Sequence, residues 1–320
     1  MCPVLHILQV TFPFFALVLL GFLATRRGVL PVAAIPGLNA FVLYFALPCM
    51  LFRFGAKTPL PQLLDVRLAA VYLLAALLIV ALTVMLTRRG RIGWNDASFG
   101  ALVAAFPNSG FMGVPLLVAL LGAQAAGPAI VTLVLDLVLT SSLCIALSRL
   151  ESAGLGGAGQ AARNALRGVA SNPMPWSILL GALASGTGWM LAAPVMHTVD
   201  LLADAASPVA LFTIGAVLAR SQMANARPTD LRDYAPVVFI KLFLHPLLVG
   251  VLGWAAMQAG LALDPFSLTV AVLVAALPSA SNVSLLAERF GADNGRIARI
   301  ILWTTALAFF SFSAAVALIT

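Results

Sequence analysis

The fold of this chain is decided by Ala104-Ala105-Phe106-Pro107-Asn108-Ser109-Gly110-Phe111-Met112-Gly113-Val114-Pro115. This stretch lies inside an apolar run, residues 95–121, that is long enough to cross a bilayer as a helix. Pro107 interrupts that helix, because its ring clashes with the carbonyl of Val103 and it lacks a backbone N–H. Non-helical backbone survives at mid-membrane depth only inside protein or beside a water-filled cavity. We therefore interpret the interruption as a ligand site.

A second apolar run, residues 266–287, is interrupted in a similar way. It contains Ala275-Ala276-Leu277-Pro278-Ser279-Ala280-Ser281-Asn282, and both stretches share the order Ala-Ala-apolar-Pro. Paired interrupted helices in corresponding positions of two chain halves indicate the binding site of a secondary transporter. The alternative is that Pro107 and Pro278 only kink packed helices, which membrane proteins tolerate.

The composition excludes a water-soluble fold. The chain has 320 residues, of which 62% are hydrophobic and 9% are charged, whereas soluble domains carry about 25% charge. Its net charge of +7 does not indicate a nucleic-acid partner, because the basic residues fall in short loops between apolar runs, as membrane topology requires. The three cysteines are scattered, so we expect neither a metal site nor a disulfide framework. No sequence feature indicates a cofactor.

We predict an all-α integral membrane protein with ten spanning helices, each long enough for a hydrocarbon core of about 30 Å. Most of the 18 Lys and Arg residues, Arg296 included, fall at the loops that follow the odd-numbered spans. Because basic loops are cytoplasmic, both termini are expected outside a cytoplasmic membrane. The predicted spans are residues 5–25, 35–54, 68–87, 95–121, 124–150, 173–191, 196–220, 231–258, 266–287 and 296–320.

The two halves of the chain are expected to be inverted repeats. We predict a first five-helix repeat in residues 1–150, a cytoplasmic linker in 151–172 and a second five-helix repeat in 173–320. Ala46-Leu47-Pro48 matches Ala206-Ser207-Pro208, and the two Ala-Ala-apolar-Pro stretches follow in the same order. Because five is odd, the second repeat enters the membrane from the opposite face.

Four motifs carry a resemblance to the auxin efflux carrier family, which includes plant pin-formed auxin carriers and bacterial carriers of malonate or malate. The residues from Pro107 to Leu117 resemble its fourth helix, and Phe45-Ala46-Leu47-Pro48 resembles its second. Lys241-Leu242-Phe243-Leu244-His245-Pro246 resembles its eighth helix, and Ala276-Leu277-Pro278 its ninth. The resemblance covers nearly the whole chain.

The resemblance implies a fold similar to that of sodium/bile-acid symporters. Spans one, two, six and seven would form a scaffold, and spans three to five and eight to ten a mobile transport unit. Broken helices four and nine would cross, and the protein would form a homodimer. The chain lacks the long central cytoplasmic loop of the plant carriers, so neither their phosphorylation control nor their substrate carries over.

The two interruptions supply the candidate binding groups. Free amides at half-helix N-termini attract a small carboxylate, and carbonyls such as those of Val103 and Val274 would attract a cation such as Na⁺. Pro48 and Pro208 would shape the scaffold side of the site. The candidate substrate- and ion-binding residues are Pro107, Asn108, Ser109, Gly110, Pro278, Ser279, Ser281 and Asn282.

Three ionisable residues fall inside predicted spans, where they are costly and often functional. Asp136 is expected to bind H⁺ or Na⁺, while Lys241 would either complement a substrate carboxylate or pair with Asp136. The alternatives are a structural ion pair between helices, or a lysine whose ammonium reaches the membrane interface. For His245, which precedes Pro246, a packing role is the alternative to coupling.

These features predict a secondary carrier that moves a small organic anion by alternating access. A passive channel and a membrane receptor are the alternatives. An intramembrane enzyme is not indicated, because the sequence contains no HExxH or GxSxG motif. A GxxxxGK[ST] phosphate-binding loop is also absent. The expected partners are therefore the anion, H⁺ or Na⁺, and the lipid bilayer.

Overall fold

The structure, a computed structural model, describes residues 3–89, 92–149, 173–189, 191–224 and 230–319. Within these ranges the regular structure is helical, apart from one isolated antiparallel bridge between Pro107 and Ser279. The prediction of an all-α chain is therefore confirmed. The predicted linker, 151–172, lies outside the described residues. The chain divides into two compact units, and each is described by itself.

Helical segments occur within all ten of the ranges predicted to span the membrane. Two further apolar helices, Ser109–Leu121 and Pro265–Ala276, are shorter because each is one part of an interrupted range. The described residues are thus those of a multi-pass membrane protein. Seven helical segments in the described part are long and apolar enough to cross a bilayer: Ile7–Arg26, Val32–Lys57, Leu60–Thr87, Ala123–Ser148, Ala193–Met223, Leu231–Gln258 and Asn294–Ile319.

The first unit comprises Met1–Asp65, Gly110–Val131 and Asn172–Ala224. It includes η3 (Ser109–Gly113) apart from its first residue. It also includes the first six residues of α8 (Ala126–Leu135). Its other elements are α1 (Pro3–Arg26), η1 (Val32–Ala34), α2 (Ile35–Phe41), η2 (Val42–Ala46), α3 (Leu47–Lys57), α4 (Leu60–Leu63), α7 (Val114–Leu121), η4 (Ala123–Ala125), α11 (Pro173–Thr187) and α12 (Ala193–Ala224).

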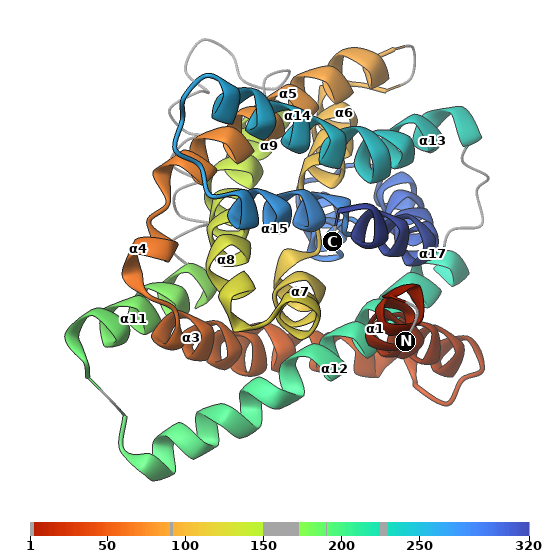
Figure 1. Cartoon of the computed structure of the whole chain (residues 1–320). Coiled ribbons are helices and arrows are strands. Elements are labelled where there is room, and N and C mark those ends of the chain that lie inside the picture. Colours follow the sequence, from red (N-terminus) through yellow and green to blue (C-terminus); the bar gives the residue numbers. More distant parts are fainter. Residues whose placement is uncertain (1–2, 90–91, 150–172, 190, 225–229, 320) are drawn as a thin grey trace. The chain divides into compact units, whose positions relative to one another are not determined.

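Helices of the first unit pack closely through glycines. α1 lies against α12, and α3 lies against both α11 and α12 (Figure 1). A Cβ atom at Gly215 of α12 would collide with the carbonyl oxygen of Val18, and one at Gly55 of α3 would lie 3.0 Å from the carbonyl oxygen of Ile178. Small residues at these positions let the helix backbones approach each other, which is how membrane helices gain packing energy.

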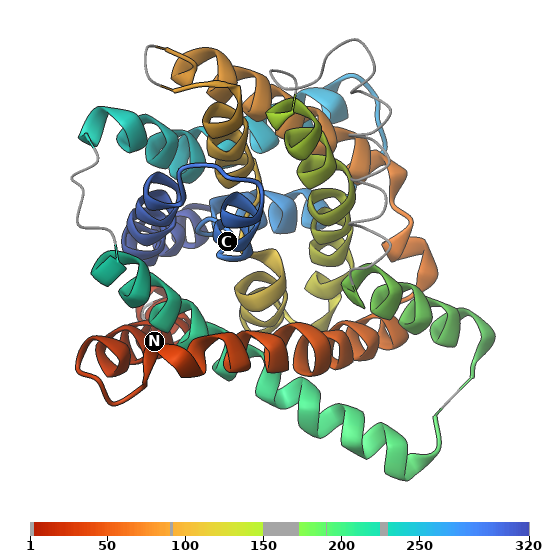
Figure 2. The same cartoon turned by 180° about the vertical axis from the view of Figure 1, so that it is seen from behind.

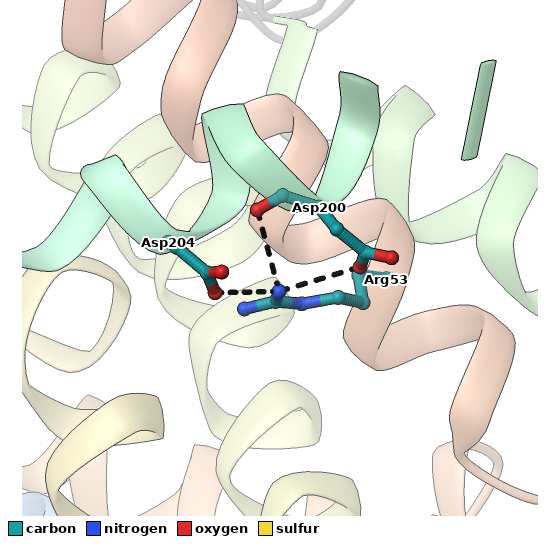
Figure 3. Close-up of polar contacts among 3 residues, drawn as sticks. All are labelled: Arg53, Asp200 and Asp204. Atoms are coloured by element: carbon teal, nitrogen blue, oxygen red, sulfur yellow. Dashed lines mark hydrogen bonds and ion pairs between the residues drawn. The ribbon is translucent and has the colours of Figure 1, made fainter. Parts of the chain in front are cut away.

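An ion cluster also joins α3 to α12. The Nη1 atom of Arg53 lies 2.7 Å from Oδ1 of Asp204 and 3.3 Å from Oδ1 of Asp200, and its contacts are drawn in Figure 3. The same nitrogen donates to the backbone carbonyl of Asp200 at 3.5 Å. Because this side chain is largely covered, the cluster fixes the register of the two helices better than a freely exposed pair would.

The second unit comprises Val66–Ser109, Thr132–Ser171 and Asn225–Thr320. In it α14 packs between α5 and α15, and α17 packs against both α13 and α15; the pair α13 and α17 is seen as teal and dark blue ribbons in Figure 2. Its elements include α5 (Val66–Thr87), α6 (Trp94–Ala105), η5 (Asp136–Thr140), α9 (Ser141–Ser148), α13 (Leu231–Phe239), η6 (Ile240–Leu244), α14 (His245–Gln258), α15 (Pro265–Ala276), α16 (Asn282–Arg289) and α17 (Asn294–Ile319).

Wide π-helical turns precede three prolines of the chain. The turns η2, η3 and η6 end two residues before Pro48, Pro115 and Pro246 respectively. A proline cannot donate to the carbonyl four residues earlier and its ring pushes that carbonyl away. A π-helical turn widens the backbone at the same place, so the helix continues beyond the proline.

Arg296, which was counted among the basic residues at the loops, lies in the first turn of α17 and is buried, with 2% of its surface exposed. Its Nε donates to the carbonyl of Asp233 at 2.7 Å, and its Nη1 donates to the carbonyl of Asp96 at 2.8 Å. Gly100 leaves room for this guanidinium, since a Cβ there would lie 2.9 Å from Nη1. One side chain therefore joins the first turns of α6, α13 and α17.

Candidate functional site

The predicted interruption at Pro107 is present. α6 ends at Ala105, and Phe106 adopts an extended conformation before Pro107. A helix continuing from Val103 would need an N–H at residue 107, which proline lacks. The helical turn resumes at Ser109, where η3 begins and leads into α7. Sequence alone is sufficient to predict this break.

The predicted interruption at Pro278 is the counterpart of the first. α15 ends at Ala276, Leu277 is extended, and α16 begins at Asn282. Here Pro278 removes the N–H that would have reached the carbonyl of Val274. Each interrupted range thus has the same order of helix, extended residue, proline and new helix.

The two interruptions pair with each other by backbone hydrogen bonds. The N–H of Asn108 donates to the carbonyl of Pro278 at 2.8 Å, and the N–H of Ala280 donates to the carbonyl of Phe106 at 3.0 Å. Pro107 and Ser279 consequently form an antiparallel bridge inside the second unit. This pairing explains how buried, non-helical backbone is tolerated, because each break supplies the partners that the other one lacks.

Near the breaks, some backbone carbonyls have no helical N–H to accept from, and side chains donate hydrogen bonds to them instead. The hydroxyl of Ser279 donates to the carbonyl of Val103 at 2.8 Å, which replaces the N–H missing at Pro107. The N–H of Ser279 donates to the hydroxyl oxygen of Thr304 at 3.3 Å. The carbonyl of Ala275, which would have accepted that N–H in a continuous helix, accepts from Lys241 Nζ at 2.7 Å. The Val274 carbonyl accepts from the Leu277 N–H at 3.1 Å.

Two asparagines at the breaks keep unsatisfied amide groups. Asn108 is 4% exposed, and its side-chain amide has no hydrogen-bond partner within the described ranges. The Oδ1 atom of Asn282 is buried and likewise has no partner in the described part of the chain. Buried polar groups in proteins are normally paired. The buried Asn282 oxygen without a donor, and the Asn108 side chain on the facing break, are therefore the clearest structural indications of a ligand position.

The remaining predicted residues of the breaks have more defined roles. The hydroxyl of Ser109 is buried and donates to the carbonyl of Pro107 at 3.3 Å. Ser281 is buried at the position directly before α16. The N–H groups of Val283 and Ser284 in the first turn of α16 donate to the carbonyls of Ala280 and Ser281 at 3.3 and 3.2 Å. The N-terminus of this helix still attracts negative charge through the helix dipole.

Asp136 is buried at the start of the π-helical turn η5. Its Oδ2 accepts from the Tyr72 hydroxyl at 2.9 Å, and its Oδ1 accepts from the Thr140 hydroxyl at 3.2 Å. Two hydroxyl donors let a carboxyl group exist without water, in a span where ionisable groups are costly. Neither donor was identified from the sequence, since each is a common residue inside an apolar run.

Lys241 and His245 are buried together on the next wide turn, η6, and the start of α14. Lys241 Nζ lies 3.2 Å from Nδ1 of His245, in addition to its bond with the Ala275 carbonyl. The ring of Tyr72 lies 5.9 Å from the imidazole ring, measured between centroids. Among the described residues no ion pair within 4.0 Å joins Lys241 to Asp136. The Nε2 atom of His245 is buried and has no partner in the described ranges.

Three predicted residues belong to the first unit and are described only within it. Gly110 lies in η3, Pro48 is the second residue of α3, and Pro208 is exposed inside the unbroken helix α12. Ser207, next to Pro208, donates its hydroxyl to the carbonyl of Phe111 at 3.4 Å. In the described part of the chain no three His, Cys, Asp or Glu side chains gather in a way that could hold a metal ion.

Known proteins resemble this chain along nearly its full length. Residues 6–154 and 160–316 match the family described as "Membrane transport protein". A protein of Rhizobium meliloti (strain 1021) named "Putative malonate transporter" is 33% identical over 303 residues, which cover 92% of this chain and 90% of that protein. Escherichia coli (strain K12) has an "Uncharacterized transporter YfdV" that is 27% identical over 285 residues, covering 87% of this chain and 86% of that protein.

A more distant plant relative matches only part of the chain. "Auxin efflux carrier component 4" of Arabidopsis thaliana is 31% identical over 122 residues, which cover 37% of this chain and 19% of the plant protein. The resemblance found in the sequence motifs is thereby confirmed. These relatives are membrane transporters and not enzymes.

Proposed function

The chain belongs to the membrane transport protein family, and from that premise we propose that it is a secondary carrier of a small organic anion across the cytoplasmic membrane. The observation that carries the proposal is that two helix breaks bridge one another and present the side chain of Asn108 beside the N-terminus of α16. The substrate class is a small carboxylate such as malonate, the solute in the name of the Rhizobium meliloti relative.

The chemistry of the breaks suits reversible capture of such an anion. The side-chain N–H groups of Asn108, the hydroxyl of Ser281 and the N-terminus of α16 are neutral groups that favour negative charge. Several hydrogen bonds of moderate strength give selectivity without holding the anion so tightly that release becomes slow. A carrier needs both properties, because the solute must leave on the opposite side.

The architecture in this proposal is ten spans arranged as two inverted repeats, with both termini outside. The equal order of elements at the two breaks and their antiparallel pairing support the inverted relation. Alternating access would use spans one, two, six and seven as scaffold and the remaining spans as transport unit. Gly110, Pro48 and Pro208 stay candidate residues of the first unit in this scheme, and a homodimer is its expected assembly.

Asp136 is proposed as the group that couples transport to an ion gradient. It is a buried carboxyl with two hydroxyl partners and no basic side chain within 4.0 Å in the described ranges. Intramembrane carboxyls of this kind form proton relays in pumps and transporters. H⁺ is therefore the coupling ion favoured here, with Na⁺ as the alternative to be tested.

Counterflow of labelled malonate into proteoliposomes tests this function. Asn108→Ala removes the open amide, while the backbone N–H that bonds Pro278 stays in place, so we expect a folded protein without counterflow. Asn39→Ala in α2 is the matched control and is expected to keep full counterflow. Wild-type counterflow in the Asn108→Ala variant would remove this residue from the site. Flux that never shows counterflow would identify a channel instead.

A further inference from the structure

The ammonium group of Lys241 lies at the C-terminal end of a helix, where the helix dipole is negative. Lys241 is fully buried, and its Nζ lies 2.7 Å from the carbonyl oxygen of Ala275 in the last turn of α15. Carbonyls at the C-terminal end of a helix carry partial negative charge and attract cations. In carriers built on broken helices, such half-helix ends help to coordinate the coupling Na⁺. Here a covalently attached cation is already present at one of them.

Other carbonyls at the two breaks are also occupied by protein donors. The Val103 carbonyl accepts from the Ser279 hydroxyl, and the Val274 carbonyl accepts from the Leu277 N–H. A sodium ion bound to these oxygens would have to compete with hydrogen bonds that the fold already makes. Sodium prefers several free oxygen ligands, so the geometry favours the lysine over a bound ion at this place.

The ammonium lies beside the same break that pairs with Asn108. Ala275 precedes Pro278 by three residues, and α15 ends between them at Ala276. Pro278 in turn accepts the hydrogen bond from Asn108. A carboxylate held by the asparagine amides would therefore lie in the field of this charge, with Asp136, His245 and Tyr72 as the other ionisable groups of the cluster.

We propose that Lys241 is the resident cation of the anion site, in the place that a bound Na⁺ takes in other broken-helix carriers, so that transport by this chain requires no Na⁺. The inference rests on the proposed function and adds to it the source of the compensating charge. His245 positions the ammonium by accepting one of its hydrogen bonds through Nδ1. The Ala275 carbonyl accepts another.

The first test replaces Na⁺ by N-methylglucamine on both sides of proteoliposomes and measures malonate counterflow. Unchanged counterflow is expected, and counterflow that requires Na⁺ overturns the inference while leaving the carrier function intact. If malonate and a panel of other small mono- and dicarboxylates show no counterflow in either medium, the carrier function itself fails. The two failures are thus distinguishable.

The second test removes the charge and measures malonate binding by calorimetry. Lys241→Met should weaken malonate affinity by roughly 10-fold or more, because the bound anion loses its compensating charge. Lys241→Arg retains the charge and should bind within a few-fold of wild type, while Lys57→Met, at the exposed end of α3, should be unchanged. Wild-type affinity in Lys241→Met overturns the inference. If that variant does not fold, the sodium test decides.

Discussion

Ser279→Ala is the substitution that probes the pairing of the two helix breaks most specifically. The hydroxyl of Ser279 donates to the carbonyl of Val103 at 2.8 Å, and both groups are buried. That carbonyl has no helical donor, because residue 107 is a proline. The substitution therefore leaves a buried carbonyl oxygen without a partner, which costs about 1–3 kcal/mol.

The measurement is the midpoint of thermal unfolding of the purified protein in detergent. For a chain of this size a loss of about 1–3 kcal/mol corresponds to a fall in Tm of roughly 1.5–4.5 °C. Ser313→Ala is the matched control, because its hydroxyl donates at 2.6 Å to the Phe309 carbonyl four residues earlier in the same helix. That carbonyl keeps a backbone donor after the substitution, so the control should shift Tm by less than about 1 °C.

Equal Tm values for Ser279→Ala and Ser313→Ala would refute the reasoning. They would mean that the Val103 carbonyl is not held by Ser279, or that water reaches it freely. The account of how the membrane interior tolerates the two breaks would then have to be abandoned, since it assigns each lost helical donor a specific replacement.

Two further predictions concern the second unit. Gly100→Ala should lower the free energy of unfolding by about 1–3 kcal/mol, because the added Cβ would lie 2.9 Å from Nη1 of buried Arg296. Gly250→Ala is the control and should be neutral or stabilising, because its Cβ would meet Val272 Cγ2 at 3.6 Å. Equal effects of the two substitutions on the denaturation midpoint would contradict the prediction. Tyr72→Phe should lower the free energy of unfolding by about 1–3 kcal/mol, because it removes a hydrogen-bond donor to Asp136. Tyr44→Phe is the control and should leave stability unchanged, because that residue is 63% exposed. A Tyr72→Phe protein with wild-type stability and full malonate counterflow would exclude this hydroxyl from both roles.

The breaks could be predicted from the sequence because proline acts locally. Pro107 and Pro278 each remove one helical hydrogen bond whatever surrounds them, and each lies inside an apolar run. The partners of the exposed backbone could not be predicted in the same way. Ser279 and Val103 are 176 residues apart, and Tyr72 and Asp136 are 64 apart, so their contacts follow from the tertiary fold alone.

Charged residues show the same limit. Lys241 was expected to pair with Asp136 or to complement a substrate carboxylate, and its hydrogen bond to the Ala275 carbonyl could not be predicted. Arg296 was counted among the basic residues at the loops, and its hydrogen bonds to backbone carbonyls of two other helices could not be predicted. The feature of the sequence that relates to this packing is Gly100, whose missing side chain leaves room for the guanidinium of Arg296. The division of spans into scaffold and transport unit stays a prediction.

The central claim is that an anion binds at the paired breaks, and the position of bound malonate in an experimentally determined complex tests it most directly. We predict density for the dicarboxylate within hydrogen-bonding distance of the Asn108 amide and the first turn of α16. Malonate bound away from both breaks, in protein that still shows counterflow, would contradict the account.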